Sequence, residues 1–527
     1  MKKIISLLLS LVMMLSLVSI AFASEPKIPV IVVSGMGTDQ FVINEDGSKT
    51  QVWPPQADVI VKGIAGVLPG IAASLLTKDY SKIAPFLGGV KDMFLPLACD
   101  TNGKLIKNVQ PDLYPLPIGE YPDDFNEDNV TTEKAICRSI ADEIGYDNSY
   151  FFNYVYSANP MDHADDLEKY IDGVLEQTGA DKVSLIACSM GGTITMSYLY
   201  KYGTSKIKNV VLASTAFLGT EIVGQLFTKD VGISIYDALR YFSEFTGYDF
   251  VQTLVTLAQK GIGEADIDIL GTANDFVSNL VESLKDVAFS DVFLDTYVTM
   301  PGIWALMPHS YYEKAKTALI EDKSRYAFLE NGENSIDNYM YSVQSNAGKI
   351  ISDARNNGVN VYIVATYFCP GIPVQLDASN YTDNLIDVKY AGGYATVAKY
   401  GETLKNTVGT VCDSKEHNHL SPDGIIDASS CILPEQTWFI KNVGHMQYVY
   451  DTPLCALLNV LAISDEEISV NTYEEYPQFT QYNTVTKTLT SSFENSTSKT
   501  SSDYLTLLFE LIKKVIFFIR DLFIANK

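Results

Sequence analysis

The chain has 527 residues, of which 47% are apolar and 19% charged, and its formal net charge is −26. This composition provides enough apolar side chains for a large core and excludes a wholly disordered chain. So acidic a surface would repel the phosphate backbone of nucleic acid, which is therefore not an expected partner.

The N-terminus has the features of an export signal. Lys2 and Lys3 precede a mostly apolar run over residues 4–20, and Ala21-Phe22-Ala23 is a small-x-small cleavage site. Residues 1–23 are therefore predicted to be a signal peptide, and the protein is expected to be secreted or held at the cell surface. The alternative is an uncleaved membrane anchor.

Short apolar runs alternate with helical patterns along much of the chain. Strands are predicted at 27–33, 150–156, 182–187, 208–213, 360–366 and 437–441, and helices at 165–177 and 190–202. Strands that alternate with helices predict an α/β fold with a mostly parallel central sheet and helices on both faces.

Two insertions and a tail interrupt or follow this pattern. Helical stretches dominate from about 216 to 350, which predicts a helical cap, and a second insertion is predicted at about 369–422. The main domain is expected over residues 24–483. Residues 484–503 are rich in Ser and Thr and are predicted to be a linker.

Residues 504–527 have apolar side chains at helical spacing and a basic edge formed by Lys513, Lys514 and Arg520. Two interpretations stay open for this amphipathic C-terminal helix. It could dock on the main domain, because so apolar a helix is unstable in water. It could instead lie on a membrane or an anionic polymer of the cell envelope.

A serine stands where a buried strand turns into a helix, in the sequence DKVSLIACSMGGTITMSY over 181–198. A sharp strand-turn-helix of this kind holds a nucleophilic serine, here Ser189, above the sheet edge in a strained conformation. The turn requires small neighbours two positions away, and these are Ala187 and Gly191. The alternative is a serine that only caps the helix.

A serine hydroxyl needs a base and an orienting acid. His445 follows the strand predicted at 437–441 and is the expected base, with Gly444 giving its loop freedom. In the chain order Ser, Asp, His, the acid is expected to be Asp423, on a Pro-Asp-Gly turn, with Asp427 as the alternative.

Two backbone amides are expected to bind the oxyanion that forms when the serine attacks. One is the amide of Met190, next to the nucleophile, and the other comes from the loop Gly35-Met36-Gly37, with Met36 preferred. No metal or organic cofactor is required. His417 and His419, near Asp413 and Glu416, could bind a metal, but a polar loop near the site is the preferred interpretation.

The chain has seven cysteines, and an odd number in an exported protein leaves at least one thiol unpaired. Cys188, beside the tight turn, is expected to be unpaired, whereas Cys412 with Cys431 is the most plausible disulfide.

Several of these segments resemble the lecithin:cholesterol acyltransferase-like branch of the α/β-hydrolases. They are PVIVVSGMG at 29–37, CSMGG at 188–192, PGIWALMP at 301–308, PGIP at 370–373 and PDGII at 422–426. The resemblance implies an α/β-hydrolase fold and acyl-ester chemistry on lipid-like substrates. Cys188 and Pro422 depart from the family pattern, which often has His and Gly at these positions.

The expected function is that of a secreted serine esterase or lipase that acts on a lipid or other acyl ester through Ser189, Asp423 and His445. An acyltransferase with an alcohol acceptor is one alternative, because both reactions share an acyl-enzyme. A non-catalytic surface protein that binds the envelope on a hydrolase fold is the other.

Overall fold

The computed structural model describes residues 27–55, 84–126, 132–232, 278–279, 282, 285, 288–290, 292–320, 323–376, 381–399, 402–404, 412, 418–445, 452–483 and 486–493. The predicted signal peptide and the predicted C-terminal helix lie outside these residues, as do parts of the cap and of the second insertion.

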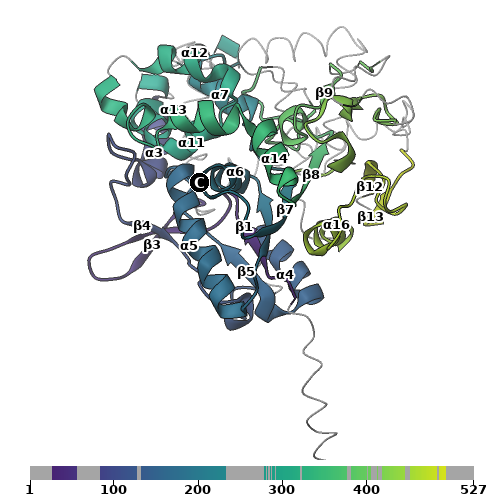
Figure 1. The fold of residues 1–527 in the computed structure, drawn as a ribbon. Helices are drawn as coiled ribbons and strands as arrows, with labels where there is room; N and C mark the ends of the chain where they lie inside the picture. The colour runs from purple at the N-terminus through teal and green to yellow at the C-terminus, as the bar shows by residue number, and fades with distance from the viewer. Residues whose placement is uncertain are drawn as a thin grey trace, which may run out of the picture.

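An eight-stranded sheet forms the centre of the molecule, in the order β13-β12-β11-β8-β7-β6-β1-β5 (Figure 1). All neighbouring pairs are parallel except β12 and β13, which are antiparallel. Its strands are β1 (Val30–Val33), β5 (Ser149–Phe152), β6 (Val183–Cys188), β7 (Ile207–Ala213), β8 (Asn360–Tyr367), β11 (Thr437–Lys441), β12 (Phe479–Asn483) and β13 (Thr488–Thr490).

Helices cover both faces of this sheet. On β1, Ile31 and Val33 join one buried cluster with α5, α6 and α14, while Val30 and Val32 join a second cluster with α4 and α16. Because successive side chains of a strand point to opposite faces, four apolar residues in a row place β1 between two cores. The helices are α4 (Thr132–Ile144), α5 (Pro160–Thr178), α6 (Gly191–Tyr202), α14 (Ala347–Asn356) and α16 (Thr452–Ile463).

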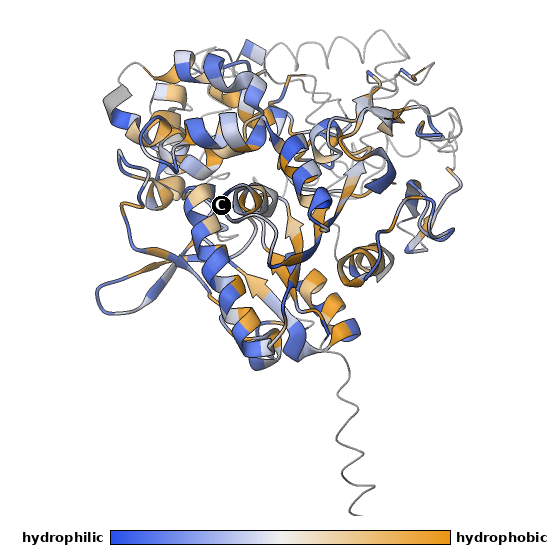
Figure 2. Ribbon diagram, viewed as in Figure 1, coloured by the Kyte–Doolittle hydropathy of each residue, from blue (hydrophilic) through white to orange (hydrophobic). Residues whose placement is uncertain are grey.

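The hydropathy of the sequence follows these layers. The strands of the central sheet are mostly apolar, whereas α5 turns many hydrophilic residues outward (Figure 2). The first core cluster is the larger one and continues from the sheet into the residues between β7 and β8.

Two small antiparallel sheets flank the central one. The first has the order β3-β2-β4, and the second pairs β10 with β9. Their strands are β2 (Gln40–Ile43), β3 (Lys49–Trp53), β4 (Val109–Pro111), β9 (Thr396–Val397) and β10 (Ile426–Asp427).

The residues described between β7 and β8 are mainly helical. Besides α14 they form α7 (Glu221–Phe227), α11 (Pro301–Ala305), α12 (His309–Leu319) and α13 (Ile336–Asn338), which continues into a π-helix at Tyr339–Gln344. Figure 1 shows α7, α11, α12 and α13 together at one end of the sheet. Two further helices lie outside this segment, α3 (Ala84–Phe94) and α15 (Val388–Ala391).

The six predicted strands are confirmed as β1, β5, β6, β7, β8 and β11, although β5 ends at Phe152 and residues 153–156 of the predicted strand lie outside it. The two predicted helices are confirmed as α5 and α6. The linker predicted at 484–503 is wrong in part, because residues 488–490 form β13 and pair with β12. Leu489 packs there against the second core cluster, so an apolar contact overrides the polar composition.

Within the described part of the chain, no helix combines the length and apolar character needed to span a bilayer.

A glycine in α6 allows the helix to approach the end of β1 closely. A Cβ atom at Gly191 would lie 2.5 Å from the carbonyl oxygen of Val33 and 2.6 Å from that of Ser34. Because both are backbone atoms, the helix would have to move. The substitution Gly191→Ala is therefore expected to lower the free energy of unfolding by about 2 kcal/mol or more in urea denaturation.

The matched control is Gly173→Ala in α5, where the new Cβ would meet only Gln177 Nε2, at 3.9 Å. Alanine is the better helix former, so this variant is expected to gain about 0.5–1 kcal/mol. Equal stability of the two variants would contradict close packing at Gly191.

Candidate active site

Ser189 occupies the tight turn between β6 and α6. Its φ of 52° lies in the left-handed region, which non-glycine residues seldom adopt. The Ser189 carbonyl accepts hydrogen bonds from the amides of Ala216, at 2.9 Å, and Gly192, at 3.3 Å. The strained backbone is thus held by the segment that follows β7, and the half-buried side chain stands at the carboxyl edge of the sheet.

The loop after β1 lies against this serine. A Cβ atom at Gly35 would come within 2.7 Å of Ser189 Cβ and 3.2 Å of Ser189 Oγ. The Tyr154 hydroxyl donates to the Ser34 carbonyl at 2.9 Å, and Trp53 Nε1 donates to the Met36 carbonyl at 2.5 Å. The predicted Gly35-Met36-Gly37 loop is therefore beside Ser189 and anchored on both sides.

His445 approaches the serine from the loop that follows β11. Its Nε2 atom lies 2.9 Å from Ser189 Oγ, and its side chain is only 10% exposed. The neighbouring Gly444 is tightly packed, since a Cβ atom there would lie 2.3 Å from Asn384 Oδ1. The structure thus brings together the serine and the histidine that the sequence analysis selected.

The carboxylate at this histidine is that of Asp383. Its Oδ2 atom lies 2.8 Å from His445 Nδ1, and its side chain is fully buried. Its Oδ1 atom accepts from the amides of Leu385, at 3.1 Å, and Ile386, at 2.7 Å. Because a carboxylate can only accept, Nδ1 carries the proton and Nε2 is left to accept from the Ser189 hydroxyl.

The prediction of Asp423 as the acid at His445 is wrong. Asp423 Oδ2 lies 3.0 Å from the buried Lys441 Nζ and accepts from the Tyr367 hydroxyl at 3.2 Å, while Oδ1 accepts from Ser421 Oγ at 2.6 Å. A buried ammonium needs a counter-charge, and Asp423 supplies it.

The alternative acid, Asp427, is also engaged elsewhere, because it accepts from the amide and the hydroxyl of Ser429.

Asp383 could have been found by its place in the chain, because it lies 16 residues beyond the end of β8, the strand of the central sheet that comes before β11. Asp423 follows the same strand and stands in the segment that resembles a family motif. The folding of the second insertion made the difference. Cys369 and Thr382 pair through an antiparallel backbone bridge, which returns the chain to the sheet edge at Asp383.

Burial and charge act in opposite directions on His445. Burial disfavours the imidazolium, but the charge and hydrogen bond of Asp383, with the charge of Glu133, outweigh it and raise the pKa of His445 above 6.5. Only the neutral imidazole can accept a proton, so this site is expected to be active above that pKa.

Glu133 is a buried carboxyl group that the sequence analysis did not select. It stands in the first turn of α4 and is 6% exposed. Burial raises the pKa of Glu133, while a hydrogen bond from the Gly35 backbone and the charge of His445 act against the rise. Its Oε1 atom would lie 2.7 Å from a Cβ at Gly35, so the carboxyl group supports the loop beside Ser189.

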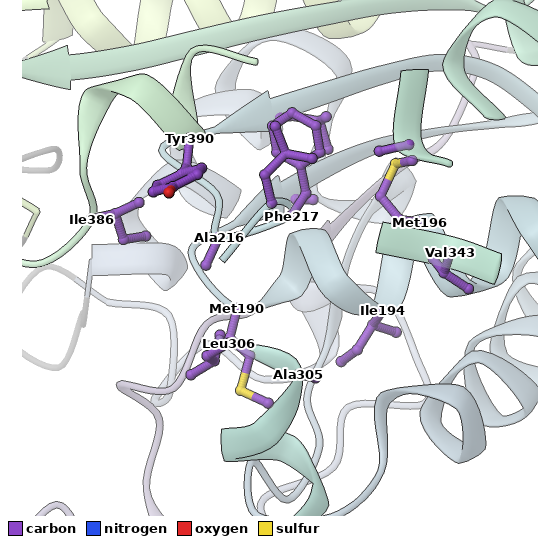
Figure 3. Close-up of a cluster of buried hydrophobic side chains, with 14 of the residues drawn as sticks. Met190, Ile194, Met196, Ala216, Phe217, Ala305, Leu306, Val343, Ile386 and Tyr390 are labelled. Atoms are coloured by element: carbon purple, nitrogen blue, oxygen red, sulfur yellow. The ribbon is translucent and has the colours of Figure 1, made fainter. Parts of the chain in front are cut away.

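Apolar side chains from three parts of the chain surround the turn. Figure 3 shows the Met190 side chain beside that of Leu306, which follows α11, and Ile386, which follows Asp383 in the chain, near Tyr390. The approach of α11 is close, since a Cβ at Gly302 would lie 2.8 Å from Met190 Cε. The helical segment between β7 and β8 therefore packs directly on the residue next to Ser189.

None of the seven cysteines forms a disulfide, so the expected bridge between Cys412 and Cys431 is wrong. Cys188 is unbridged and buried, as predicted. The part of the chain that is described contains one group of side chains with metal-ligand spacing, Cys412, His419 and Glu435. His419 contacts Gln478, which bonds to the carbonyl of Thr437 at the amino end of β11, whereas Ser189 lies at the carboxyl edge of the sheet. His417 lies outside the described residues.

Comparisons with known proteins agree with this architecture. A family model described as "alpha/beta hydrolase fold" matches residues 132–244, from α4 to beyond α7. With the mostly parallel sheet and its flanking helices, this match shows that the chain has the α/β-hydrolase fold.

One similar solved structure is the crystal structure of the Tle4-Tli4 complex, at 12% identity and a TM-score of 0.25, covering 64% of this chain and 75% of that chain. No curated protein matches the sequence.

Changing Asp383 or Asp423 to asparagine is expected to have different effects. Asp383→Asn would favour the wrong imidazole tautomer, and labelling of Ser189 by a fluorophosphonate is expected to slow by roughly 10⁴-fold. Asp423→Asn is expected to label within a few-fold of the parent but to lose about 3 kcal/mol of stability, because Lys441 stays buried without its counter-charge. Equal rates of Ser189 labelling in the two variants would show that Asp383 is not the carboxylate that orients His445.

Glu133→Gln is expected to shift the acid limb of the labelling profile to lower pH. Loss of a nearby anion lowers the pKa of the imidazolium, so His445 stays neutral at lower pH. The control is Glu143→Gln, at the exposed far end of α4, which is expected to leave the limb in place. A purely structural role for Glu133 would lower the rate at every pH without moving the limb.

Proposed function

We propose that this protein is a serine hydrolase that cleaves acyl esters of lipid-like compounds outside the cell. One observation carries this function: Ser189 Oγ, His445 Nε2, His445 Nδ1 and Asp383 Oδ2 form a continuous line with separations of 2.9 and 2.8 Å. This is the spacing that a serine nucleophile, a general base and an orienting carboxylate require.

The reaction would begin with the transfer of the Ser189 proton to His445 Nε2 as Oγ attacks the acyl carbonyl. The imidazolium so formed is stabilised by the buried Asp383 carboxylate. It then returns the proton to the departing alcohol, which leaves an acyl group on Ser189. Water, activated by the same imidazole, adds to this ester and releases the carboxylic acid and the free serine.

The oxyanion of each tetrahedral intermediate needs donors that are already in place. We assign this role to the amides of Met36 and Met190, as the sequence analysis predicts. Both residues stand beside Ser189, Met190 as its chain neighbour and Met36 in the loop that contacts it through Gly35. Fixed amides of this kind contribute about 3–4 kcal/mol each to the barrier reduction.

The apolar surroundings of the turn favour a hydrocarbon acyl group. Met190 follows Ser189 in the chain, and its side chain lies beside Leu306, which follows the cap helix α11 (Figure 3). The resemblance to the lecithin:cholesterol acyltransferase-like branch favours the same substrate class. The predicted signal peptide at 1–23 favours action outside the cell.

A series of p-nitrophenyl esters tests this function. Ser189→Ala is expected to lose roughly 10⁴- to 10⁶-fold in kcat/KM, because the nucleophile is removed. The matched control is Ser197→Ala, a buried serine of α6 whose hydroxyl only donates back to the Thr193 carbonyl at 2.8 Å, and its activity is expected to change less than threefold. Equal rates for Ser189→Ala and the parent would remove the nucleophile assignment.

The same series tests the substrate class. For the parent protein, kcat/KM is expected to rise with acyl length, by at most about fourfold per methylene group, as apolar contact grows. A profile that falls steadily from acetate onward would contradict a lipid-like acyl group while leaving the hydrolase intact.

A further inference from the structure

Three potential metal ligands meet at the amino ends of β11 and β12. Cys412 and His419 come from the segment before β10, and Glu435 comes from the turn that leads into β11. One ligand atom from each side chain lies within 4.8 Å of the others. Ser189 and His445 lie at the carboxyl edge of the same sheet, so this group is separate from the proposed catalytic centre.

The hydrogen bonds of Gln478 fix the orientation of the His419 ring. Gln478 Nε2 donates to the carbonyls of Pro434, at 2.6 Å, and Thr437, at 3.0 Å. The amide orientation is therefore determined, and Gln478 Oε1 is the atom that accepts from His419 Nδ1, at 2.7 Å. In the neutral ring the proton is thus on Nδ1, and Nε2 carries a lone pair.

That lone pair faces a carboxylate. His419 Nε2 lies 3.0 Å from Glu435 Oε1, and the His419 side chain is 4% exposed. Both atoms are electron-pair donors, and a cation placed between them would be attracted to both. The thiol of Cys412 adds a third electron-pair donor at the same place.

We propose that Cys412, His419 and Glu435 bind a zinc ion. Thiolate, imidazole and carboxylate are the ligand types that zinc takes, at about 2.0–2.3 Å each, and donors around a tetrahedral ion are then about 3.3–3.8 Å apart. The site requires only a small adjustment of the side chains to reach these separations.

The contact from Gln478 is the outer hydrogen bond that orients a zinc-bound histidine. Among the described residues, these three side chains supply three of the four positions of the tetrahedron. The ion fastens the segment around Cys412 and His419 to the start of β11, which ends four residues before His445. Because the ion lies at the opposite end of the strand, its contribution is to stability and not to ester cleavage.

Metal content and thermal stability of the untagged, full-length protein test this site. After dialysis against metal-free buffer and addition of zinc, about one zinc per chain is expected by mass spectrometry. Zinc is expected to raise Tm by roughly 5 °C or more, since it binds the folded chain alone. Ester hydrolysis by the metal-free protein is expected to stay within threefold of the zinc-loaded protein at 25 °C.

The variant Glu435→Gln separates a metal from a plain ion pair. It is expected to bind zinc at least 100-fold more weakly, yet its metal-free Tm should equal or exceed that of the parent, because an amide N–H can donate to His419 Nε2. His419→Gln and Cys412→Ser are expected to lose zinc as well. The control His309→Gln, a histidine at the start of α12, should keep one zinc per chain.

Two results would overturn the site. The first is that the parent protein binds no stoichiometric zinc and its Tm does not change when zinc is added. A lower metal-free Tm for Glu435→Gln, without zinc binding by the parent, would show that a protonated His419 and Glu435 form an ion pair instead. Either result leaves the proposed hydrolase activity untouched, because that function depends on Ser189 labelling and not on metal.

Discussion

The left-handed turn at Ser189 is the constraint on which the rest of the site depends. A non-glycine residue at φ 52° persists only if its surroundings hold it. Here the end of β1, α4 and α6 converge on the turn so closely that Gly35 and Gly191 have no room for a side chain. The strain is offset by the packing of a sheet that is buried on both faces.

Around this turn, charged and polar side chains from distant segments of the chain come together. Asp383 fixes the proton on His445 Nδ1, which leaves Nε2 free to accept from the serine. Glu133 adds a second buried carboxyl group that reaches the Gly35 loop and raises the pKa of His445. The residues that raise the pKa of His445 therefore come from α4 and from the second insertion, not from the loop that carries the histidine.

Strand β11 connects two polar centres of different character. At its carboxyl end, His445 faces Ser189, where a strained and half-buried site suits chemistry. At its amino end, His419 is held by Gln478 against Glu435, an arrangement that favours a bound cation. Also at the carboxyl end, Lys441 and Asp423 form a buried ion pair that joins the residues just after the second insertion to the strand. A short strand thus supports the proposed catalytic centre, the proposed metal site and a buried ion pair.

Local sequence determined six of the eight strands of the central sheet, the helices that follow β5 and β6, and the choice of Ser189 and His445 as a pair that meets. These are encoded by short-range rules, because periodicity shows burial and a sharp strand-turn-helix restricts which residues fit. The tertiary structure alone decided which carboxylate meets His445 and which side chains surround His419. Asp383 and Asp423 both follow β8, and only the folding of the second insertion, through contacts between residues far apart in the chain, brings one of them to the imidazole and the other to Lys441.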